Sequence, residues 1–433
     1  MLDRPPGPYR VFSDSDVIDH LAGLQRVRDL LGGSPQDWRV RDVADGNLNA
    51  VFLVGGPAGG GVCVKQALPY VRVAGESWPL DVNRATYEAA YLSRLAPHVR
   101  GLAPELHHYD PRQFVIVMEK LEPHIILRKG LIAGERFLKA PEHVAEYVAQ
   151  AAFHTSDLAV PFERKAADVA LFGQNLALQR ITVDLVFTDP YVEVWRNKVV
   201  APLQAWAHAL RSDIALKSAV ADLRLRYLTQ AQSLLHGDLH SGSVMATPDD
   251  TRVIDGEFAW VGPTGFDVGN FIAHYVMAWF AKPSHAGKRE AIAAYRDAIA
   301  GDIARFWLTF RRRFLDIWRQ SDAAGDGLPS AHFSDAAGQA RVEAIRRAYV
   351  EAIFRDALGY LAIKTIRRII GYAQIADFLV IEDVNRRAVL QAGALALARA
   401  LLKRPQDFPD IAALIDALPR FEGAGLDPKR APQ

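Results

Sequence analysis

Three acidic residues lie in two short polar segments, with Asp238 in Leu235–His240 (LHGDLH) and Asp255 and Glu257 in Val253–Glu257 (VIDGE). A carboxylate on a loop can take the proton from an acceptor hydroxyl, and two carboxylates at a strand end can hold Mg²⁺. These are the parts that phosphoryl transfer needs, because it depends mostly on positioning and charge neutralisation. Acidic residues also cap turns and end strands, and for the HGD segment alone that explanation stays open. The acidic pair some seventeen residues after Asp238 favours the chemical interpretation.

A lysine and a glutamate nearer the N-terminus could serve the same chemistry. Lys65 ends a predicted apolar strand, and in kinase-like folds a lysine directed from a strand into a cleft pairs the nucleotide phosphates. Glu88, on the next predicted helix, is the candidate partner that would hold this lysine. The plainer alternatives are a solvated strand end for Lys65 and a helix-surface carboxylate for Glu88.

Two glycine-containing turns compete for the role of a phosphate-facing loop. Gly55–Gly61 (GGPAGGG) lacks the Gly-Lys-Ser/Thr ending of a Walker loop and does not open a helix, so we interpret it as a flexible hairpin tip. Asp45–Asn49 (DGNLN) is the better candidate. Its single glycine allows a tight bend, and neighbours such as Asn49 can present amide and backbone N–H groups.

Candidate substrate contacts lie in two further segments. Val71–Pro79 (VRVAGESWP) is predicted to be a loop with Trp78 at its tip, although a tryptophan is more often a buried anchor. Arg367 and Arg368 stand near the end of a long helical segment, for which Gly371 is a plausible stop. They could clamp an anionic or polyhydroxylated substrate, or form a basic helix end favoured by the helix dipole. Adjacent helical positions point about 100° apart, so the two arginines should have different roles.

The pattern around these residues separates a strand-rich beginning from a helical remainder. Before residue 121 it predicts strands at 38–43, 49–54, 62–65 and 114–118, and a helix at 84–95. Afterwards it predicts helices at 141–154, 302–319, 340–370 and 383–402, interrupted at 234–269 by a segment with a strand at 252–255. We therefore expect an α+β fold of two lobes: a β-rich nucleotide-binding lobe at 1–120, and a helical catalytic and substrate-binding lobe at 121–433. Ligands favour clefts between such units.

Composition excludes several classes of protein. The 433 residues carry 51 Lys and Arg against 50 Asp and Glu, a balance unlike that of a general nucleic-acid binder. The single cysteine, Cys63, excludes an intrachain disulfide and a multi-cysteine metal site. The longest apolar stretch, 271–281, is too short to cross a bilayer, and the first sixteen residues lack the apolar core of a secretory signal. We expect a cytoplasmic protein with no nucleic-acid or membrane partner. His154, His274 and His285 show no metal-like spacing and are interpreted as structural.

Five segments together resemble the 5-methylthioribose kinase family: DGNLN, VKQALPYVRVAGESWPL, HGDLHSGS, VIDGEFAWVGPTGFDVGNF and IRRIIG. That family belongs to the protein-kinase-like superfamily, which also holds aminoglycoside and choline kinases. The resemblance extends from about Arg41 to about Asp377. HGD with a later aspartate indicates only the superfamily. The GESWP segment, Asp-x-Glu in place of Asp-Phe-Gly, and the arginine pair are more specific.

The resemblance implies ATP-dependent phosphorylation of the 1-hydroxyl of 5-methylthioribose in methionine salvage, with Mg²⁺ as cofactor and a homodimer as the assembly. It makes Asp238 the catalytic base and Asp255 and Glu257 the metal ligands. It also implies contacts to ATP, with Glu119–Leu121 as the adenine-binding hinge, from Asn49, Lys65, Glu88, Glu119, Lys120, Leu121, Asp255, Gly256 and Glu257. The residues expected to meet the sugar are Trp78, Asp238, Arg367 and Arg368.

Two positions depart from related patterns, and two other functions stay open. Ser243 stands where related kinases carry a metal-binding Asn, which leaves the metal to the acidic pair, and Gly256 stands where Pro is expected. A kinase of another small sugar or amino alcohol is the first alternative, although the paired arginines oppose a polycationic aminoglycoside. An inactive nucleotide-binding scaffold is the second. A protein kinase is disfavoured because no Asp-Phe-Gly to Ala-Pro-Glu segment is present.

Overall fold

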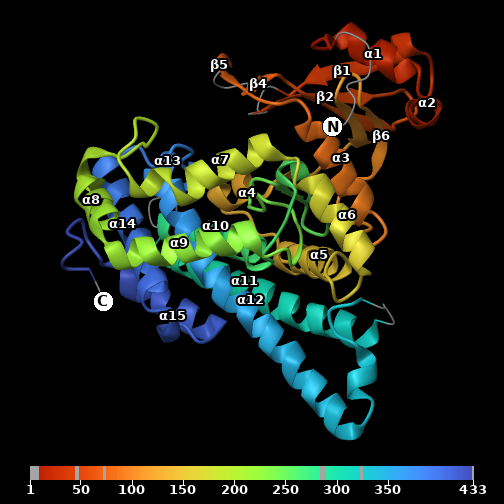
Figure 1. Cartoon of the computed structure of the whole chain (residues 1–433). Coiled ribbons are helices and arrows are strands. Elements are labelled where there is room, and N and C mark those ends of the chain that lie inside the picture. The colour runs from red at the N-terminus through yellow and green to blue at the C-terminus, as the bar shows by residue number, and fades with distance from the viewer. Residues whose placement is uncertain (1–8, 44–47, 72–74, 283–288, 322–324, 432–433) are drawn as a thin grey trace.

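The structure, a computed structural model, describes residues 9–43, 48–71, 75–282, 289–321 and 325–431. It consists of a small lobe built on an antiparallel sheet and a large helical lobe below it (Figure 1). This agrees with the α+β, two-lobed fold predicted from the sequence. Among the described residues, no helix combines the length and the apolar character needed to cross a membrane.

The small lobe is organised by one five-stranded sheet in the order β1-β2-β3-β7-β6. Its strands are all antiparallel to their neighbours: β1 (Arg39–Asp42), β2 (Asn49–Gly55), β3 (Gly61–Ala67), β7 (Val115–Glu119) and β6 (Leu106–Asp110). Val62 and Val64 of the central strand β3 belong to one apolar cluster and Ala67 to another, so both faces of this strand are covered, which accounts for its nearly continuous burial. The four predicted strands are all present, and β6 is an addition to them.

Two helices precede the sheet, although this region was predicted to be mainly strand and turn. α1 (Asp14–Ala22) opens with a capping box between Ser13 and Asp16, and α2 (Gln25–Leu31) follows. Their buried side chains pack on the sheet: Val17, Leu21, Val27 and Leu31. The prediction was wrong here because only a narrow apolar stripe of each helix is buried, and the polar remainder resembles a turn region.

The glycine-rich turn of Gly55–Gly61 joins β2 to β3, as predicted, but it is packed against α2. A Cβ atom at Gly56 would lie 2.0 Å from the carbonyl oxygen of Leu31, and one at Gly60 would lie 1.9 Å from that of Leu30. The Ala58 N–H also donates to the Leu31 carbonyl at 3.2 Å. Glycine is needed because two backbones meet without room for side chains, so the turn is a packing surface and not a flexible tip.

A separate two-stranded ribbon extends from the small lobe toward the large one. β4 (Tyr70–Val71) pairs with β5 (Gly75–Pro79), so Trp78 lies within a strand and not at a loop tip. Trp78 and Val71 belong to an apolar cluster with Leu178 of the large lobe. The loop prediction was wrong because the two short segments find each other as partners. α3 (Arg84–Leu95), at its predicted bounds, follows the ribbon.

The large lobe is a stack of helices around α10 (Gly265–Ala281), which is buried throughout, and α12 (Ala336–Ile370), whose buried residues lie almost all from Val350 onward. Every residue of α10 is buried, which explains why its apolar stretch is long without being a membrane span. The remaining α-helices of this lobe are α4 (Leu127–Ala133), α5 (Ala140–His154), α6 (Phe162–Phe172), α7 (Leu176–Phe187), α8 (Gln204–Ser212), α9 (Ile214–Thr229), α11 (Arg289–Gln320), α13 (Ala376–Leu379), α14 (Val384–Lys403) and α15 (Ile411–Glu422). Within the described residues, the short 3₁₀ helices are η1 (Pro35–Asp37), η2 (Asp189–Tyr191), η3 (Ala201–Leu203), η4 (Gly256–Phe258), η6 (Ser330–Phe333) and η7 (Pro405–Asp407). α11 begins thirteen residues before its predicted start, since its first turns mix small and charged residues without a clear apolar stripe.

Short strands occupy the predicted interruption of the helical lobe. They are β9 (Ser233–Leu235), β10 (Val244–Ala246), β11 (Thr251–Val253) and β12 (Trp260–Gly262), and they are preceded by β8 (Ile125–Ile126), which lies outside the predicted interruption. Only the third of these four was predicted, because three-residue strands leave almost no periodic signal. β11 ends two residues earlier than expected, and Asp255 then adopts a left-handed conformation with φ 71°. β8 pairs with β10, so the chain joins the large lobe soon after β7.

Candidate active site

The loop that carries Asp238 connects β9 to β10 and is supported from below by α10. Asp267 of that helix accepts hydrogen bonds from the backbone N–H groups of His236 at 2.6 Å and Gly237 at 3.1 Å. Gly237 has φ 82°, and a Cβ there would lie 2.1 Å from the carbonyl oxygen of Phe258. The glycine of HGD is thus required both by its backbone angle and by a close approach.

Two more residues of α10 lie on the same helical face, because they follow Asp267 by three and seven positions. The Asn270 amide lies 3.5 Å from Oδ1 of Asp238. His274 is fully buried, its Nδ1 lies 3.1 Å from the Ser241 hydroxyl, and its ring stacks on His240 with centroids 4.7 Å apart. The structural role predicted for His274 therefore consists of supporting the Asp238 loop. One helix face braces most of this loop.

The carboxylate of Asp238 lies among donors from three elements. His240 Nε2 lies 3.3 Å from Oδ2, and Arg368 of α12 lies 3.8 Å from the same oxygen. Lys364, one turn earlier on α12, lies 3.4 Å from Oδ1. Burial acts to raise the pKa of Asp238, but His240, Lys364 and Arg368 outweigh it and lower the pKa well below its ordinary value. The carboxylate is therefore ionised and can accept a proton.

The protonation state of His240 follows from its hydrogen bonds. Its Nδ1 accepts the backbone N–H groups of Gly242 at 2.9 Å and Ser243 at 3.0 Å, so the proton of the neutral ring belongs on Nε2, which faces Asp238. Burial lowers the pKa of His240 to about 3. This histidine is a neutral donor to Asp238 at physiological pH.

Ser243 takes part in the internal bonding of the same loop. Its hydroxyl accepts the His240 N–H at 2.8 Å and lies 3.1 Å from the Asp238 carbonyl oxygen. This side chain is buried and turned toward the loop backbone. Ser243 therefore stabilises the conformation of the loop that carries Asp238.

Lys65 lies inside β3, facing the large lobe, and not at a solvated strand end. Its side chain is 10% exposed and its Nζ lies 2.8 Å from Glu88 of α3. It also pairs with Asp255, which follows β11. Burial acts to lower the pKa of Lys65, but the nearby carboxylates, Asp255 first, raise it above the ordinary value. Glu88 is buried as well, so the helix-surface alternative for that residue was wrong.

Glu257 is held by a residue that the sequence analysis missed. Arg84, at the start of α3, has a fully buried side chain whose Nε lies 3.2 Å from Oε2 of Glu257. Its Nη2 donates to the Asn49 side chain at 3.0 Å and to the Leu48 carbonyl at 2.7 Å. Asn49 in turn donates to Glu257 at 3.0 Å. Arg84 thus ties α3, the beginning of β2 and the acidic segment together.

The three carboxylates of Glu88, Asp255 and Glu257 form a compact acidic cluster. Each offers one oxygen, and these oxygens lie within 4.8 Å of one another. Burial raises the pKa of Glu88 to about 7 and raises that of Glu257, while the neighbouring lysine outweighs burial and lowers the pKa of Asp255. Asp255 is the member whose side chain is exposed, at 48%. Hard carboxylate oxygens beside an open position fit Mg²⁺ bound together with nucleotide phosphates.

Gly256, where Pro was expected, is covered by an aromatic ring from α3. A Cβ atom at this position would lie 2.5 Å from Cδ1 of Tyr91. The Tyr91 hydroxyl also lies 2.7 Å from that of Tyr147 in α5. The glycine therefore accommodates a tyrosine that anchors α3 to the large lobe.

Arg367 and Arg368 both lie inside the large lobe close to the end of α12, which stops at Gly371 as predicted. Arg368 approaches Asp238, and its Nη1 lies 3.4 Å from the Ala373 carbonyl oxygen. Within the described part of the chain, Nε and Nη1 of Arg367 and Nε of Arg368 are buried without a hydrogen-bond partner. Buried donors of this kind need a partner, so they mark a place where a polar ligand would bind. A solvated basic helix end was the wrong alternative.

The remaining predicted contacts lie around these groups. Glu119 ends β7 and its N–H donates to the Glu105 carbonyl at 2.8 Å, while Lys120 pairs with Glu122 at 2.5 Å. Leu121 is half-buried at the crossing between the lobes. The preferred phosphate-facing turn lies mostly outside the described residues, at Asp45, Gly46 and Asn47, as does His285.

Trp78 reaches the large lobe near the arginine pair but is not among the contacts of Asp238. Its ring centroid lies 5.3 Å from that of Tyr372, which follows Gly371 directly. The Nζ of Lys198 lies over the Tyr372 ring, 5.0 Å from its centroid. The small-lobe ribbon is therefore joined to the end of α12 by an aromatic contact.

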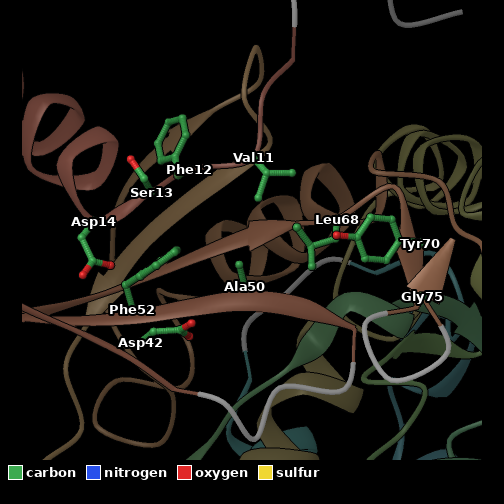
Figure 2. A pocket seen from close by; sticks show the side chains of 10 residues that line it. All are labelled: Val11, Phe12, Ser13, Asp14, Asp42, Ala50, Phe52, Leu68, Tyr70 and Gly75. Carbon is green, nitrogen blue, oxygen red and sulfur yellow. The ribbon is translucent and has the colours of Figure 1, made fainter.

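A separate hollow of about 680 Å³ lies on the small lobe, away from Asp238 and the acidic cluster. Figure 2 shows the side chains that line it: Val11, Phe12, Ser13, Asp14, Asp42, Ala50, Phe52, Leu68, Tyr70 and Gly75. It is open to solvent, and its lining mixes apolar side chains with the polar side chains of Ser13, Asp14 and Asp42. None of the predicted site residues lines it.

Sequence reasoning missed Arg84, Lys364 and the supporting face of α10. Lys364 could have been found from its spacing, because residues three and four positions later are the arginine pair and all three share one face of a helix. Asp267, Asn270 and His274 likewise follow helical spacing. Arg84 has no such local signal, since its partners come from distant segments.

The arrangement as a whole sets an ionised loop carboxylate opposite a strand lysine and an acidic cluster, between a sheet-based lobe and a helical lobe. This combination defines a phosphotransferase of the two-lobed, protein-kinase-like class. Residues 39–301 match the phosphotransferase enzyme family.

Curated relatives match nearly the whole chain. Methylthioribose kinase 1 of Oryza sativa subsp. japonica is 37% identical over 417 residues, covering 96% of this chain and 96% of its own. A methylthioribose kinase of Yersinia pseudotuberculosis serotype O:3 (strain YPIII) is 38% identical over 424 residues, covering 98% and 99%. That of Escherichia coli O45:K1 (strain S88 / ExPEC) is 35% identical over 419 residues, covering 96% and 99%. The chain belongs to the methylthioribose kinase family, as the sequence motifs indicated.

Proposed function

We propose that this protein transfers the γ-phosphoryl group of ATP to the 1-hydroxyl of 5-methylthioribose, giving ADP and the sugar 1-phosphate. The observation that carries the proposal is the ionised Asp238 beside the buried, partly unpartnered guanidinium groups of Arg367 and Arg368. A polyhydroxylated sugar supplies acceptors for such donors and a hydroxyl proton for the base. The relatives that match nearly the full chain are methylthioribose kinases.

In the proposed reaction the oxygen of the sugar 1-hydroxyl forms a bond to the γ-phosphorus of ATP, and Asp238 accepts the proton of that hydroxyl. The bond between the γ-phosphorus and the oxygen that leaves with ADP breaks at the same time. The low pKa of Asp238 keeps its carboxylate ionised throughout the working range, so it is free to take the proton as the P–O bond forms. Arg368, which is close to Asp238, stabilises charge on the transferring group, and Arg367 hydrogen-bonds the ribose hydroxyls. Trp78 closes over the sugar through its ribbon.

The nucleotide is held by the small lobe. Lys65 and Asn49 bind the phosphates, with Glu88 fixing the lysine, and the backbone of Glu119–Leu121 binds the adenine. Bound to Asp255 and Glu257, Mg²⁺ would neutralise phosphate charge. Gly256 lets the acidic segment pass under Tyr91 while both carboxylates face the nucleotide. On this assignment residues 1–120 form the nucleotide-binding lobe and 121–433 the catalytic and substrate-binding lobe.

A coupled ADP-release assay over a panel of sugars and amino alcohols tests the proposal. The panel contains 5-methylthioribose, ribose, glucosamine, choline and an aminoglycoside, each with ATP and Mg²⁺. We expect turnover with 5-methylthioribose to exceed that with every other acceptor, and phosphorus NMR to place the phosphate on carbon 1. Faster turnover of another sugar or amino alcohol would replace the proposed substrate. If no acceptor of the panel leads to ADP release, the inactive-scaffold alternative is supported.

We further propose that the protein acts as a homodimer in the cytoplasm. The lone Cys63 is compatible with a reducing compartment because it leaves no intrachain disulfide to protect. Light scattering coupled to size exclusion tests the assembly, for which a mass near twice 47.8 kDa is expected. A mass near 47.8 kDa at micromolar concentration would contradict it.

A further inference from the structure

We infer that Lys364 is a positioning residue for the base, whose ammonium group holds the Asp238 carboxylate in place and must be charged for full turnover. This inference rests on the proposed function of the site. It concerns a residue that neither the motifs nor the arginine pair include.

The position of Lys364 is set by three elements. Its side chain is 2% exposed and its Nζ lies 3.4 Å from Oδ1 of Asp238. The same nitrogen lies 4.3 Å from the ring centroid of Phe266 in α10, a cation–π contact that restricts it on the other side. Arg367 and Arg368 follow it at three and four positions, so all three basic groups share one face of α12. Lys364 is thus held against the base by packing.

The two oxygens of Asp238 are approached by different kinds of donor. Oδ1 receives Lys364 and the uncharged amide of Asn270, while Oδ2 receives the neutral ring of His240 and the guanidinium of Arg368. Lys364 is therefore the charged group on the Oδ1 side. Without it, the Asn270 amide at 3.5 Å would be the remaining restraint on this oxygen among the described residues. A base that rotates spends less time aligned with the acceptor hydroxyl.

The charge of Lys364 is also the one that changes in an accessible pH range. Burial, Arg367 and Arg368 lower its pKa to about 8, against the opposing effect of Asp238 and of Asp267 on α10. Burial lowers the pKa of Arg368 too, but a guanidinium starts far higher than an ammonium and stays charged in proteins. His240 is already neutral. Because an ammonium is charged below its pKa, the support of Asp238 is present at pH 7 and lost as pH rises through about 8.

Two substitutions separate charge from packing. Lys364→Arg keeps a cation that does not titrate in the working range, and Lys364→Met keeps the length of the side chain without charge. The matched control is Lys165→Met on α6, since Lys165 is also buried with a lowered pKa, but its Nζ donates to the backbone carbonyls of Thr155 and Gln232 and pairs with Asp157 at 3.6 Å instead of with Asp238. For each protein, kcat and the KM of both substrates are measured from pH 6 to 10, together with Tm.

The expected results are specific to the base. Wild-type kcat falls about tenfold between pH 7 and pH 9, as expected for one group titrating near 8. Lys364→Arg retains kcat within a few-fold at pH 7 and loses this alkaline decrease. Lys364→Met lowers kcat about 10- to 100-fold at pH 7 and leaves the KM for ATP unchanged. The kcat of this variant does not fall further between pH 7 and pH 9. Lys165→Met lowers Tm but keeps the wild-type pH profile.

Wild-type kcat and pH profile in Lys364→Met, or a wild-type alkaline decrease in Lys364→Arg, would overturn the inference. If Lys364→Met does not fold, the profile of Lys364→Arg decides the question. Failure of the proposed function is seen separately, in a wild-type protein that phosphorylates no acceptor of the panel. In that case the inference about Lys364 is also wrong, because it depends on the proposed activity. With an active wild type, only the Lys364 variants decide.

Discussion

The ring of Tyr91 covers Gly256 so closely that a Cβ atom there would lie 2.5 Å from Cδ1 and 2.8 Å from Cε1 of the tyrosine. Gly256 separates the two acidic residues of the site, and Tyr91 stands on the helix that carries Glu88. One aromatic ring therefore sets the distance between α3 and the acidic segment. Arg94, farther along α3, donates to Asp168 at 3.0 Å and completes the attachment of the helix to the large lobe.

Gly256→Ala should destabilise the protein by about 1–3 kcal/mol and lower kcat, because the added methyl group displaces the Tyr91 ring or the acidic segment. Urea unfolding and steady-state kinetics measure the two effects. Gly301→Ala is the matched control, since Gly301 is an exposed position of α11 with nothing within 4 Å of the added Cβ. Replacing Tyr91 by Ala in the Gly256→Ala background should recover kcat if the clash is the cause.

Asp238→Asn should keep the fold and nucleotide binding but reduce kcat by about 10²–10⁴-fold, because an amide cannot take the hydroxyl proton. Circular dichroism, calorimetric titration with an ATP analogue and single-turnover kinetics check the three parts. A variant with wild-type turnover would show that another group is the base.

Arg84→Met should cost about 3–5 kcal/mol of stability, because it leaves the buried carboxylate of Glu257 without its guanidinium partner. The KM for ATP should also rise, since Asn49 loses a bond that fixes its side chain. Chemical unfolding and kinetics at varied Mg²⁺ test this. In Glu257→Gln/Arg84→Met the two changes should be less than additive, and full additivity would argue against the pairing.

The two arginines should respond differently to replacement by lysine. Arg368 is close to Asp238, so Arg368→Lys should mainly lower kcat. Arg367→Lys should mainly raise the KM for the sugar, because its buried donors need the ligand's hydroxyl groups. Varying each substrate in turn separates these effects. Identical behaviour of both variants would remove the division of roles.

Asp302 of α11 should reduce stability at neutral pH. Its side chain is 5% exposed, and burial raises its pKa to about 6 despite Arg136 and Arg305. A raised carboxyl pKa favours the protonated folded state, so stability falls as pH rises from about 4 to 6. Asp302→Asn should therefore raise stability at pH 7 by about 1–3 kcal/mol and flatten this dependence. Thermal unfolding at several pH values tests it, with the exposed Asp297→Asn as the control.

The sequence alone determined the segments that form the proposed active site. Asp238 in HGD and Asp255 with Glu257 were identifiable because their residue types stand at fixed local spacing after apolar strands. The helix at 84–95 was also identifiable, since its apolar positions repeat with the helical period over three turns. Local patterns of this kind depend on neighbours in the chain, and a single sequence contains them.

Only the tertiary structure decided which charged residues are buried and what they hold. Arg84 contacts Glu257, 173 positions away, and Lys364 contacts Asp238, 126 positions away. An arginine or lysine is usually exposed, so nothing in its own segment distinguishes a buried one. The glycines at 56 and 60 were equally ambiguous, because the backbone that requires them belongs to another element. Burial and long-range pairing arise from how the elements pack, and this packing is what turns separate motifs into one site.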